Sequence, residues 1–423
     1  MYQLGEKIAK SIDDRTAKSA SFEVDGNGLL ISKQGGTDFQ SWVNKHHTES
    51  NKIIDDKIKG VEASLASKGT GNRDADIPPA FKQEEFASTY ESRFKQTPAE
   101  TNSNVVFEGV RGESLCTLKP PPDPTLQKIL NEAGINGIEY KNGVPDFSPV
   151  AKAQFEIEYM LGGTGKHGTK ARTINFKQAD QKLAEQLNNS PELASKFGMT
   201  PGKIKAGDIA DYREEYKLTW HELNDVKTIQ LVPSEINGKF GHLGGVGEIN
   251  AGAFKPGNLP INRKGKFKMK INDEVFGELE YDYVWSRDTT IEFCGKEADI
   301  ALMIDGEEDG EFSEKQYASY NSLIQNWGHL QQSILQPILD YYKQKRHELG
   351  YDVSYNENYP LIETIDQLLE RIRLVGIYVP SARRFEGRYI GLTFDCTWDM
   401  ENGVGIRLIS EEVARVGYQD VAI

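Results

Sequence analysis

A short segment in the middle of the chain carries four polar side chains that together could hydrolyse a phosphodiester. His221 and Glu222 end a run of β-prone residues, and Asn237 and His242 follow after a second such run. Phosphodiester hydrolysis requires a base that activates water and a divalent cation that stabilises the charge on the phosphate and the leaving oxygen. An imidazole with a pKa of about 6.5 is largely neutral at physiological pH and suits the base. Asn and Glu oxygens suit a hard ion such as magnesium or manganese.

Two strands and a helix are predicted to bring these side chains to one cleft. Residues 218–222 and 228–232 predict the strands of a hairpin, and residues 224–227 predict its turn, because Asn and Asp tolerate the backbone angles of tight turns. Ser234 is a good N-cap for a following helix. We expect that helix to end near Gly241, since glycine weakens helices.

The spacing of Asn237 and His242 limits how they share this helix. They are five residues apart, which places them roughly 140° apart on a regular helix. His242 is therefore expected at the C-terminal margin of the helix. The alternative is that each polar side chain only caps a turn or satisfies the backbone.

The motifs of this segment occur in the same order in a known nuclease superfamily. They are Trp220-His221-Glu222, the strand IQLVP at 229–233, Asn237 and FGHLGG at 240–245. The segment resembles the HNH/endonuclease VII superfamily, in the WHE variant of the WHH motif found in bacterial polymorphic toxins of the LXG type. Two positions depart from the common pattern: Glu222 replaces the second His of WHH, and Asn237 stands where many relatives have His.

The resemblance implies a ββα-metal fold and a role for each of these residues. His221 would be the general base, with Glu222 as a further catalytic or ligand group. Asn237 and His242 would be metal ligands or phosphate contacts. The expected cofactor is a divalent metal ion, magnesium or manganese first, with zinc or nickel as alternatives.

The segment before the hairpin is rich in glycine and cations. Residues 161–176 predict a flexible loop that lacks the GK[ST] ending of a phosphate-binding P-loop. Three cations of this loop are candidate phosphate contacts: Lys166, Lys170 and Arg172. Helices predicted over 176–187 and 209–216 would support the hairpin, because so small a unit cannot bury enough surface alone.

Length and charge divide the chain into unequal parts. A chain of 423 residues exceeds the usual size of one domain. Residues 161–260 carry 13 basic and 11 acidic side chains, net +2, whereas residues 261–423 carry 18 and 29, net −11. Since nucleic-acid binding requires neutralisation of phosphates, any DNA contact is expected in 161–260. Three scattered cysteines argue against a disulfide framework.

The domain organisation follows from these shifts in composition. Residues 1–104 predict a connector with a small hairpin over 22–31 and a helix over 38–66. Residues 105–260 predict the nuclease domain with the segment that precedes it in such toxins. Residues 267–423 predict an acidic α+β domain. A glycine-, proline- and lysine-containing boundary over 251–270 separates the last two.

The C-terminal domain is expected to place antiparallel strands around a long helix. Residues 314–349 predict this helix, which Pro337 should kink or divide. The predicted strands are 267–271, 276–285, 290–293, 300–304, 374–379, 390–398 and 403–408, with Asn402-Gly403 as a hairpin signal. Residues 267–423 are similar to a bacterial domain family of unknown function that lies beside toxin genes and resembles immunity proteins, and we find no catalytic motif in them.

The sequence thus predicts an α+β protein with an HNH-type endonuclease module acting on DNA, joined to an acidic domain that restrains it. The alternative is a catalytically silent toxin remnant that acts as an immunity or interaction protein. Expected partners are DNA and either a cognate immunity protein or the chain's own C-terminal domain. No run is apolar and long enough to span a membrane, and Tyr2 to Lys10 lack the features of a signal peptide. We therefore expect a cytoplasmic protein or one exported by a non-Sec route.

Overall fold

The computed structural model describes residues 22–24, 30–32, 77–253, 269–352, 356–381 and 387–423. The chain divides into two compact units, residues 1–75 and 76–423. In the first unit, β1 (Phe22–Val24) and β2 (Leu30–Ser32) pair antiparallel, which confirms the predicted hairpin. The helix predicted over 38–66 and most of the boundary over 251–270 lie outside the described residues.

The second unit contains two parts that contact each other, the middle part (residues 77–253) and the C-terminal part (residues 269–423). The middle part begins with η1 (Pro79–Phe81) and α3 (Tyr90–Gln96). A small antiparallel sheet follows, with strands β3 (Val105–Phe107), β4 (Leu115–Leu118), β5 (Gly137–Lys141) and β6 (Val144–Pro145). Helix α4 (Pro124–Ala133) and the turn η2 (Ser148–Val150) pack on this sheet.

The predicted hairpin and helix are present as β8 (Leu218–Glu222), β9 (Thr228–Pro233) and α8 (Ser234–Lys239). Strand β7 (Ala153–Glu156) adds to the far side of β9 and makes a three-stranded antiparallel sheet. All residues of β8 and β9 are buried. The helix is short and ends two residues before the predicted limit, which leaves His242 just beyond it.

Helix α5 (Gly165–Asn189) corrects the prediction of a flexible loop over 161–176. It runs for 25 residues, includes the predicted helix over 176–187, and buries most of its residues between 169 and 187. Glycine and threonine are weak helix formers, but the first half of α5 packs against the C-terminal sheet, and this long-range burial overrides local preference. Helices α6 (Pro191–Lys196), α7 (Ala206–Glu215) and α9 (Gly245–Glu248) and the turn η3 (Ile249–Ala253) complete the middle part.

The C-terminal part is built on an eight-stranded sheet in the order β10 to β17. Its strands are β10 (Lys270–Asp273), β11 (Gly277–Tyr281), β12 (Trp285–Phe293), β13 (Lys296–Ile304), β14 (Ile372–Val379), β15 (Tyr389–Cys396), β16 (Val404–Ile409) and β17 (Glu412–Gly417). The sheet is mixed, because β13 and β14 are parallel while the other neighbours are antiparallel. Strand β17 was not predicted.

The predicted long helix is divided as expected. Helix α10 (Glu314–Ser333) ends at Ile334, and α11 (Leu335–Glu348) begins there with Pro337 in its first turn, where a missing N–H costs little. Helix α12 (Ile365–Leu369) and the turn η5 (Gln419–Ala422) are the remaining helical elements described. Cys116, Cys294 and Cys396 are free thiols.

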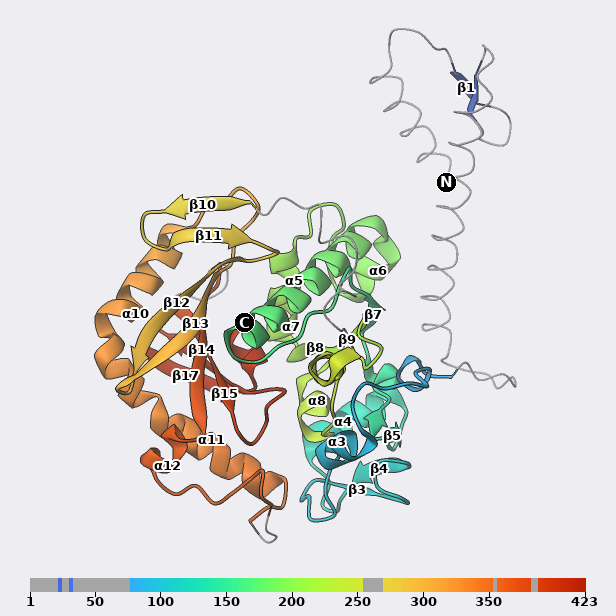
Figure 1. Ribbon diagram of the computed structural model, residues 1–423. Coiled ribbons are helices and arrows are strands. Elements are labelled where there is room, and N and C mark those ends of the chain that lie inside the picture. The colour runs from blue at the N-terminus through green and yellow to red at the C-terminus, as the bar shows by residue number, and fades with distance from the viewer. Residues whose placement is uncertain (1–21, 25–29, 33–76, 254–268, 353–355, 382–386) are drawn as a thin grey trace. The chain divides into compact units, whose positions relative to one another are not determined.

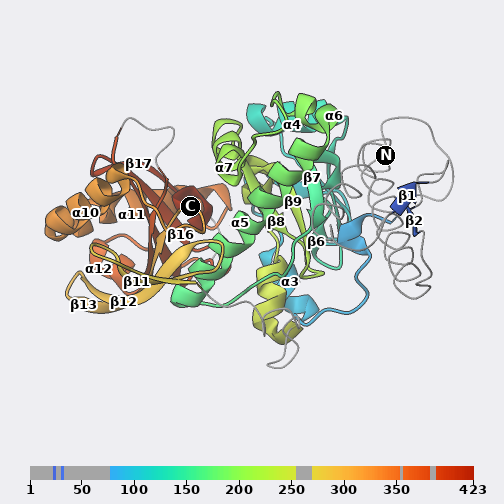
Figure 2. The same ribbon diagram turned by 90° about the horizontal axis from the view of Figure 1, so that it is seen from above.

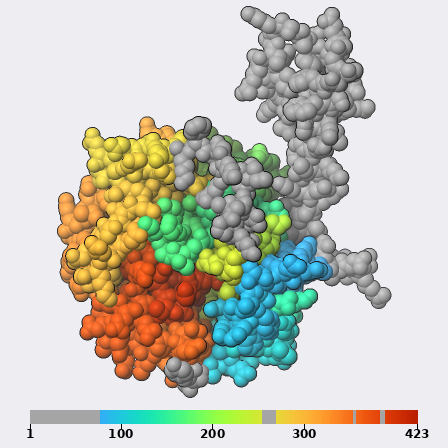
Figure 3. Space-filling view, in the orientation of Figure 1, coloured from blue at the N-terminus to red at the C-terminus, as the bar shows by residue number. Residues whose placement is uncertain are grey.

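The sheet of the C-terminal part is covered on both faces. Helices α10 and α11 pack on one face, and α5 of the middle part lies on the other (Figures 1 and 2). Strand β14 is buried on both faces over most of its length, as expected for a central strand between two layers. Figure 3 shows the C-terminal part (orange and red) in contact with the middle part (blue and green), and we call this boundary the seam. Among the helices described here, none is both long and apolar enough to cross a membrane.

Candidate active site

Strand alternation directs His221 and Trp220 to opposite faces of the hairpin. The Trp220 ring packs on Phe155 within the core under α5. Its Nε1–H donates to Asp180 Oδ1 over 2.8 Å, and Arg213 donates to both Asp180 oxygens over 2.8 and 2.9 Å. These three buried groups fix β8 relative to α5 and α7, and His221 consequently faces away from that core.

The rings of His221 and His242 lie together beside Phe147. The His221 and His242 ring centroids are 4.6 Å apart and nearly perpendicular, and Phe147 lies 4.8 and 5.3 Å from them. His221 is only 3% exposed. Burial, and then the neighbouring His242, hold the pKa of His221 well below its ordinary value. At neutral pH the His221 ring is therefore uncharged.

A hydrogen bond to the backbone sets the tautomer of His242. Its Nδ1 lies 2.9 Å from the Phe240 carbonyl oxygen, and because a carbonyl can only accept, Nδ1 carries the proton. Burial lowers the pKa of His242 to about 4. The neutral ring then has its lone pair on Nε2, as in histidine metal ligands whose other nitrogen is held by the backbone.

One small pocket brings five of the predicted site residues together. It is lined by Arg172, Thr219, Trp220, His221, Glu222, Asn237, His242, Gly244, Glu401, Asn402, Tyr418 and Asp420. Asn237 Oδ1 is buried and has no hydrogen-bond partner among the residues described. An orphaned amide oxygen beside two neutral imidazoles is a donor set that fits a divalent cation.

Within the described ranges, no group of three or more His, Cys, Asp and Glu side chains is arranged to hold a metal ion. A metal in this pocket would thus depend on Asn237 Oδ1 and His242 Nε2, with His221 beside them.

Glu222 and Arg172 both line the pocket, and Arg172 is close enough to affect the charge of Glu222. Glu222 Oε1 accepts a bond from Asn175 Nδ2 over 3.3 Å. Burial raises the pKa of Glu222, and the nearby Arg172 guanidinium partly offsets this effect. Arg172 is itself buried. Its Nη2 donates to the Glu401 carbonyl, and its Nε has no partner within the described structure.

The other two predicted phosphate contacts lie elsewhere. Lys166 pairs with Asp288 and Asp299 of the C-terminal part, at 3.2 and 2.8 Å, and Lys170 pairs with Asp288 at 2.9 Å. Of the three cations, only Arg172 lines the pocket. The loop prediction failed here because helix formation spaces these side chains along α5 towards β12 and β13.

Four residues of the pocket come from the C-terminal part and were not predicted. They are Glu401, Asn402, Tyr418 and Asp420. One local signal marks this region, the hairpin turn at Asn402-Gly403. Nothing local indicates that this turn reaches a site formed by residues some 160 to 230 positions earlier in the chain.

Each part of the chain matches a known protein family. Residues 137–244 match the family described as the DNase/tRNase domain of colicin-like bacteriocins. This match covers β8, β9 and α8 with His221, Glu222, Asn237 and His242, and it supports a nuclease toxin domain in this chain. Residues 275–423 match a domain of unknown function, DUF6985. No curated protein and no solved structure matches the chain.

Proposed function

We propose that residues 105–260 form a metal-dependent HNH-type endonuclease acting on DNA, and that residues 267–423 hold it in a closed, inactive state. The observation that carries this proposal is the pocket in which His221, Asn237 and His242 meet in the ββα order. The family match over 137–244 supports the nuclease class.

Each side chain of the pocket has a role that its environment supports. His221 is neutral and takes the proton of the attacking water. His242 Nε2 and Asn237 Oδ1 would hold a divalent cation, magnesium or manganese. When bound, that cation supplies charge stabilisation at the phosphate and the leaving oxygen. Glu222 orients the water or completes the ligand set, and Arg172 contacts the phosphate.

Buried charge pairs between the two parts support the closed state. Lys177 on α5 donates to Asp305 of the C-terminal part over 2.7 Å, and both side chains are largely buried. Burial disfavours each charge, but the attraction between them outweighs it, raising the pKa of Lys177 and lowering that of Asp305. Arg407 likewise pairs with Glu214 on α7, with Nη2 to Oε2 at 2.6 Å.

Helix α8, which carries Asn237, is also held from the C-terminal part. Lys345 of α11 donates to the Gly238 carbonyl over 3.0 Å, and Tyr418 donates to the same oxygen over 3.3 Å. Lys239 forms an ion pair with Glu348. The net charges of +2 over residues 161–260 and −11 over residues 261–423 are complementary.

One observation favours the alternative of a silent remnant. The His221 ring is 3% exposed and lies against Phe147, so it cannot reach a phosphodiester while the two parts are docked. In this alternative the chain acts as an immunity or interaction protein, and the pocket never opens.

Breaking the contacts between the two parts in the full chain distinguishes a restrained nuclease from a silent remnant. We expect the Asp305→Ala/Arg407→Ala chain to nick plasmid DNA with magnesium or manganese, and chelation by EDTA to stop the reaction. His221→Ala in the same background should abolish nicking without loss of fold, while His329→Ala, at an exposed position on α10, should leave it unchanged. Transfer RNA offered in parallel tests the choice of DNA. Failure to cut either substrate in a chain shown to be open would support the silent remnant.

A further inference from the structure

A turn of the C-terminal part enters the pocket described above. Residues 397–403 connect β15 to β16, and we refer to them as the β15–β16 turn. Glu401 of this turn makes two contacts to the middle part. Its carbonyl oxygen accepts from Arg172 Nη2, and its carboxyl Oε1 accepts from the Gly244 N–H over 2.7 Å.

The turn is fixed by its own hydrogen bonds. Asp399 Oδ1 accepts from the Asn402 N–H over 3.0 Å, and the Asp399 carbonyl accepts from the Gly403 N–H over 2.9 Å. Gly403 has φ +58°, and a Cβ there would come within 2.4 Å of the Phe394 carbonyl oxygen. Because its shape does not depend on Arg172 or Gly244, Glu401 is presented to the pocket in a set position.

The two donors that Glu401 occupies are those a phosphate group would need. The Gly244 N–H lies two residues after His242, and the Arg172 guanidinium lies beside Glu222 in the same pocket. A guanidinium and a backbone N–H are common partners of phosphate oxygens. Both are taken here by oxygen atoms of a single residue.

We infer that the β15–β16 turn stands in for the phosphodiester backbone of the substrate, with the two Glu401 oxygens occupying the sites of two phosphate oxygens. This inference rests on the proposed function and identifies the element that enforces the closed state. It adds to the ion pairs between the two parts an inhibitory contact at the proposed reaction centre itself.

The contact is incomplete in a way that allows its displacement. Glu401 Oε2 and Arg172 Nε are both buried and have no hydrogen-bond partner within the described part of the chain. Buried polar atoms without partners weaken the state that contains them. A non-bridging oxygen of a phosphodiester could satisfy the Arg172 Nε that Glu401 leaves unpaired.

DNA binding by the full chain tests the inference without requiring catalysis. All variants carry His221→Ala and are titrated in EDTA into a fluorescein-labelled duplex oligonucleotide at low salt, with fluorescence anisotropy as the readout. Glu401→Ala should tighten DNA binding by roughly tenfold or more, because a phosphate oxygen then no longer competes with the Glu401 carboxyl for the Gly244 N–H. Glu401→Gln retains the Oε1 acceptor and should bind like the parent.

The control lies on the same turn. Met400 is 73% exposed and does not line the pocket, so Met400→Ala should not change the affinity. Circular dichroism and thermal unfolding establish that each variant is folded. Equal affinities for Glu401→Ala and the parent would overturn the inference, and so would an equal gain in Met400→Ala, because any disturbance of the turn would then suffice.

The outcomes separate this inference from the proposed function. If Glu401→Ala tightens DNA binding but the same variant with His221 intact does not cut plasmid, the turn assignment stands and the nuclease proposal fails. If Glu401→Ala leaves binding unchanged while the Asp305→Ala/Arg407→Ala chain cuts plasmid, the nuclease proposal stands and the turn assignment fails.

Discussion

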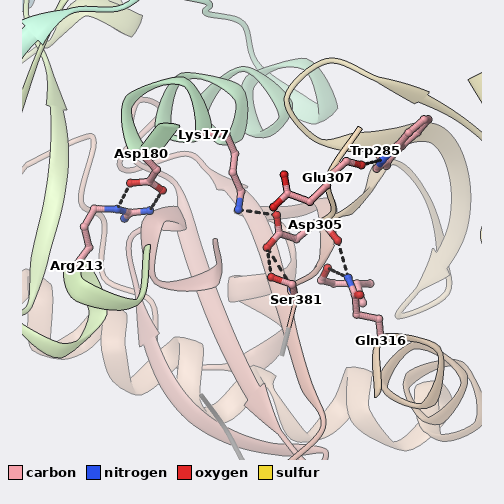
Figure 4. A network of polar contacts seen from close by, with 9 residues as sticks. Lys177, Asp180, Arg213, Trp285, Asp305, Glu307, Gln316 and Ser381 are labelled. Carbon is pink, nitrogen blue, oxygen red and sulfur yellow. Dashed lines mark hydrogen bonds and ion pairs between the residues drawn. The ribbon is translucent and has the colours of Figure 1, made fainter. Parts of the chain in front are cut away.

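The buried pair of Lys177 and Asp305 gives the most quantitative prediction about the closed state. Figure 4 shows Lys177 and Asp180 extending from α5 in different directions, Asp180 to Arg213 within the middle part and Lys177 to Asp305 across the seam. Asp305 also accepts from the Ser381 hydroxyl over 2.6 Å. Asp305→Ala therefore removes the anionic partner of a buried ammonium and leaves the middle part's own network intact.

The expected size of the effect follows from the burial of both groups. Lys177 and Asp305 side chains are 9% and 15% exposed, and removing one partner of a buried pair costs about 3–5 kcal/mol because the remaining charge is uncompensated. If this cost falls on the docked state, the ratio of open to closed chains rises by a factor of about 150 to 5,000. Plasmid nicking should rise in the same proportion until the open form dominates.

Urea unfolding measures the loss of stability in Asp305→Ala, and plasmid nicking measures the expected gain in activity. Glu308→Ala is the matched control, because Glu308 is an exposed carboxylate three residues away. Lys177→Met, made alone and together with Asp305→Ala, completes a double-mutant cycle that isolates the pair. The reasoning is wrong if Asp305→Ala shifts neither the urea midpoint nor the nicking rate relative to Glu308→Ala. A shift in stability alone would mean that the pair stabilises the fold without restraining a nuclease.

Three further predictions concern stability. Burial raises the pKa of Glu401 from its ordinary 4.5 to about 8, so the folded chain binds this proton more tightly than the unfolded chain. The stability that Glu401 contributes should therefore fall as pH rises from 4.5 to about 8. Urea midpoints measured across this pH range should fall less steeply in Glu401→Gln. Trp220→Phe removes the bond to the Asp180 carboxylate and should cost about 1.5–3 kcal/mol, measured by urea unfolding. Gly350→Ala should lower the thermal midpoint far more than Gly198→Ala, because both have positive φ but only a Cβ at 350 would meet a backbone oxygen, at 1.7 Å.

Local chemistry was sufficient to predict the hairpin that carries His221 and Glu222. The β-prone residues of 218–222 and 228–232, and the Asn and Asp in the turn, favour strands and a turn through short-range preferences, and the structure places β8 and β9 there. The division of the helix at Pro337 has the same origin, since a proline without an N–H belongs in the first turn of a helix. His221, Asn237 and His242 meet because these local elements are adjacent in the chain.

Long-range packing accounts for what the sequence did not predict. The first half of α5 has the composition of a loop, and it is helical because the sheet of the C-terminal part covers it: Thr169 bonds to Thr393 of β15, and the Gly165 N–H bonds to Asp395. Arg172 consequently turns to the pocket while Lys166 and Lys170 turn to β12 and β13. Glu401 carries no local mark of its role, because only the complete tertiary fold brings it to Gly244.

The position of α5 shows what opening of this protein would require. On one side of the helix, Asp180 and Phe176 contact the middle part. On another side, Lys177 and Ile174 contact the C-terminal part. The apolar cluster at the seam is small, centred on Tyr159, Ile174, Val284, Ala301, Met303 and Tyr378, whereas each part has its own larger core. Under the proposed function, we expect the two parts to separate at the seam while α5 remains in the middle part. Salt screens the more exposed Lys166 and Lys170 pairs, but it screens the buried Lys177 and Arg407 pairs much less. Under the proposed function, we therefore expect that the Lys177 and Arg407 pairs and the Glu401 contact at the pocket must be broken before DNA can enter.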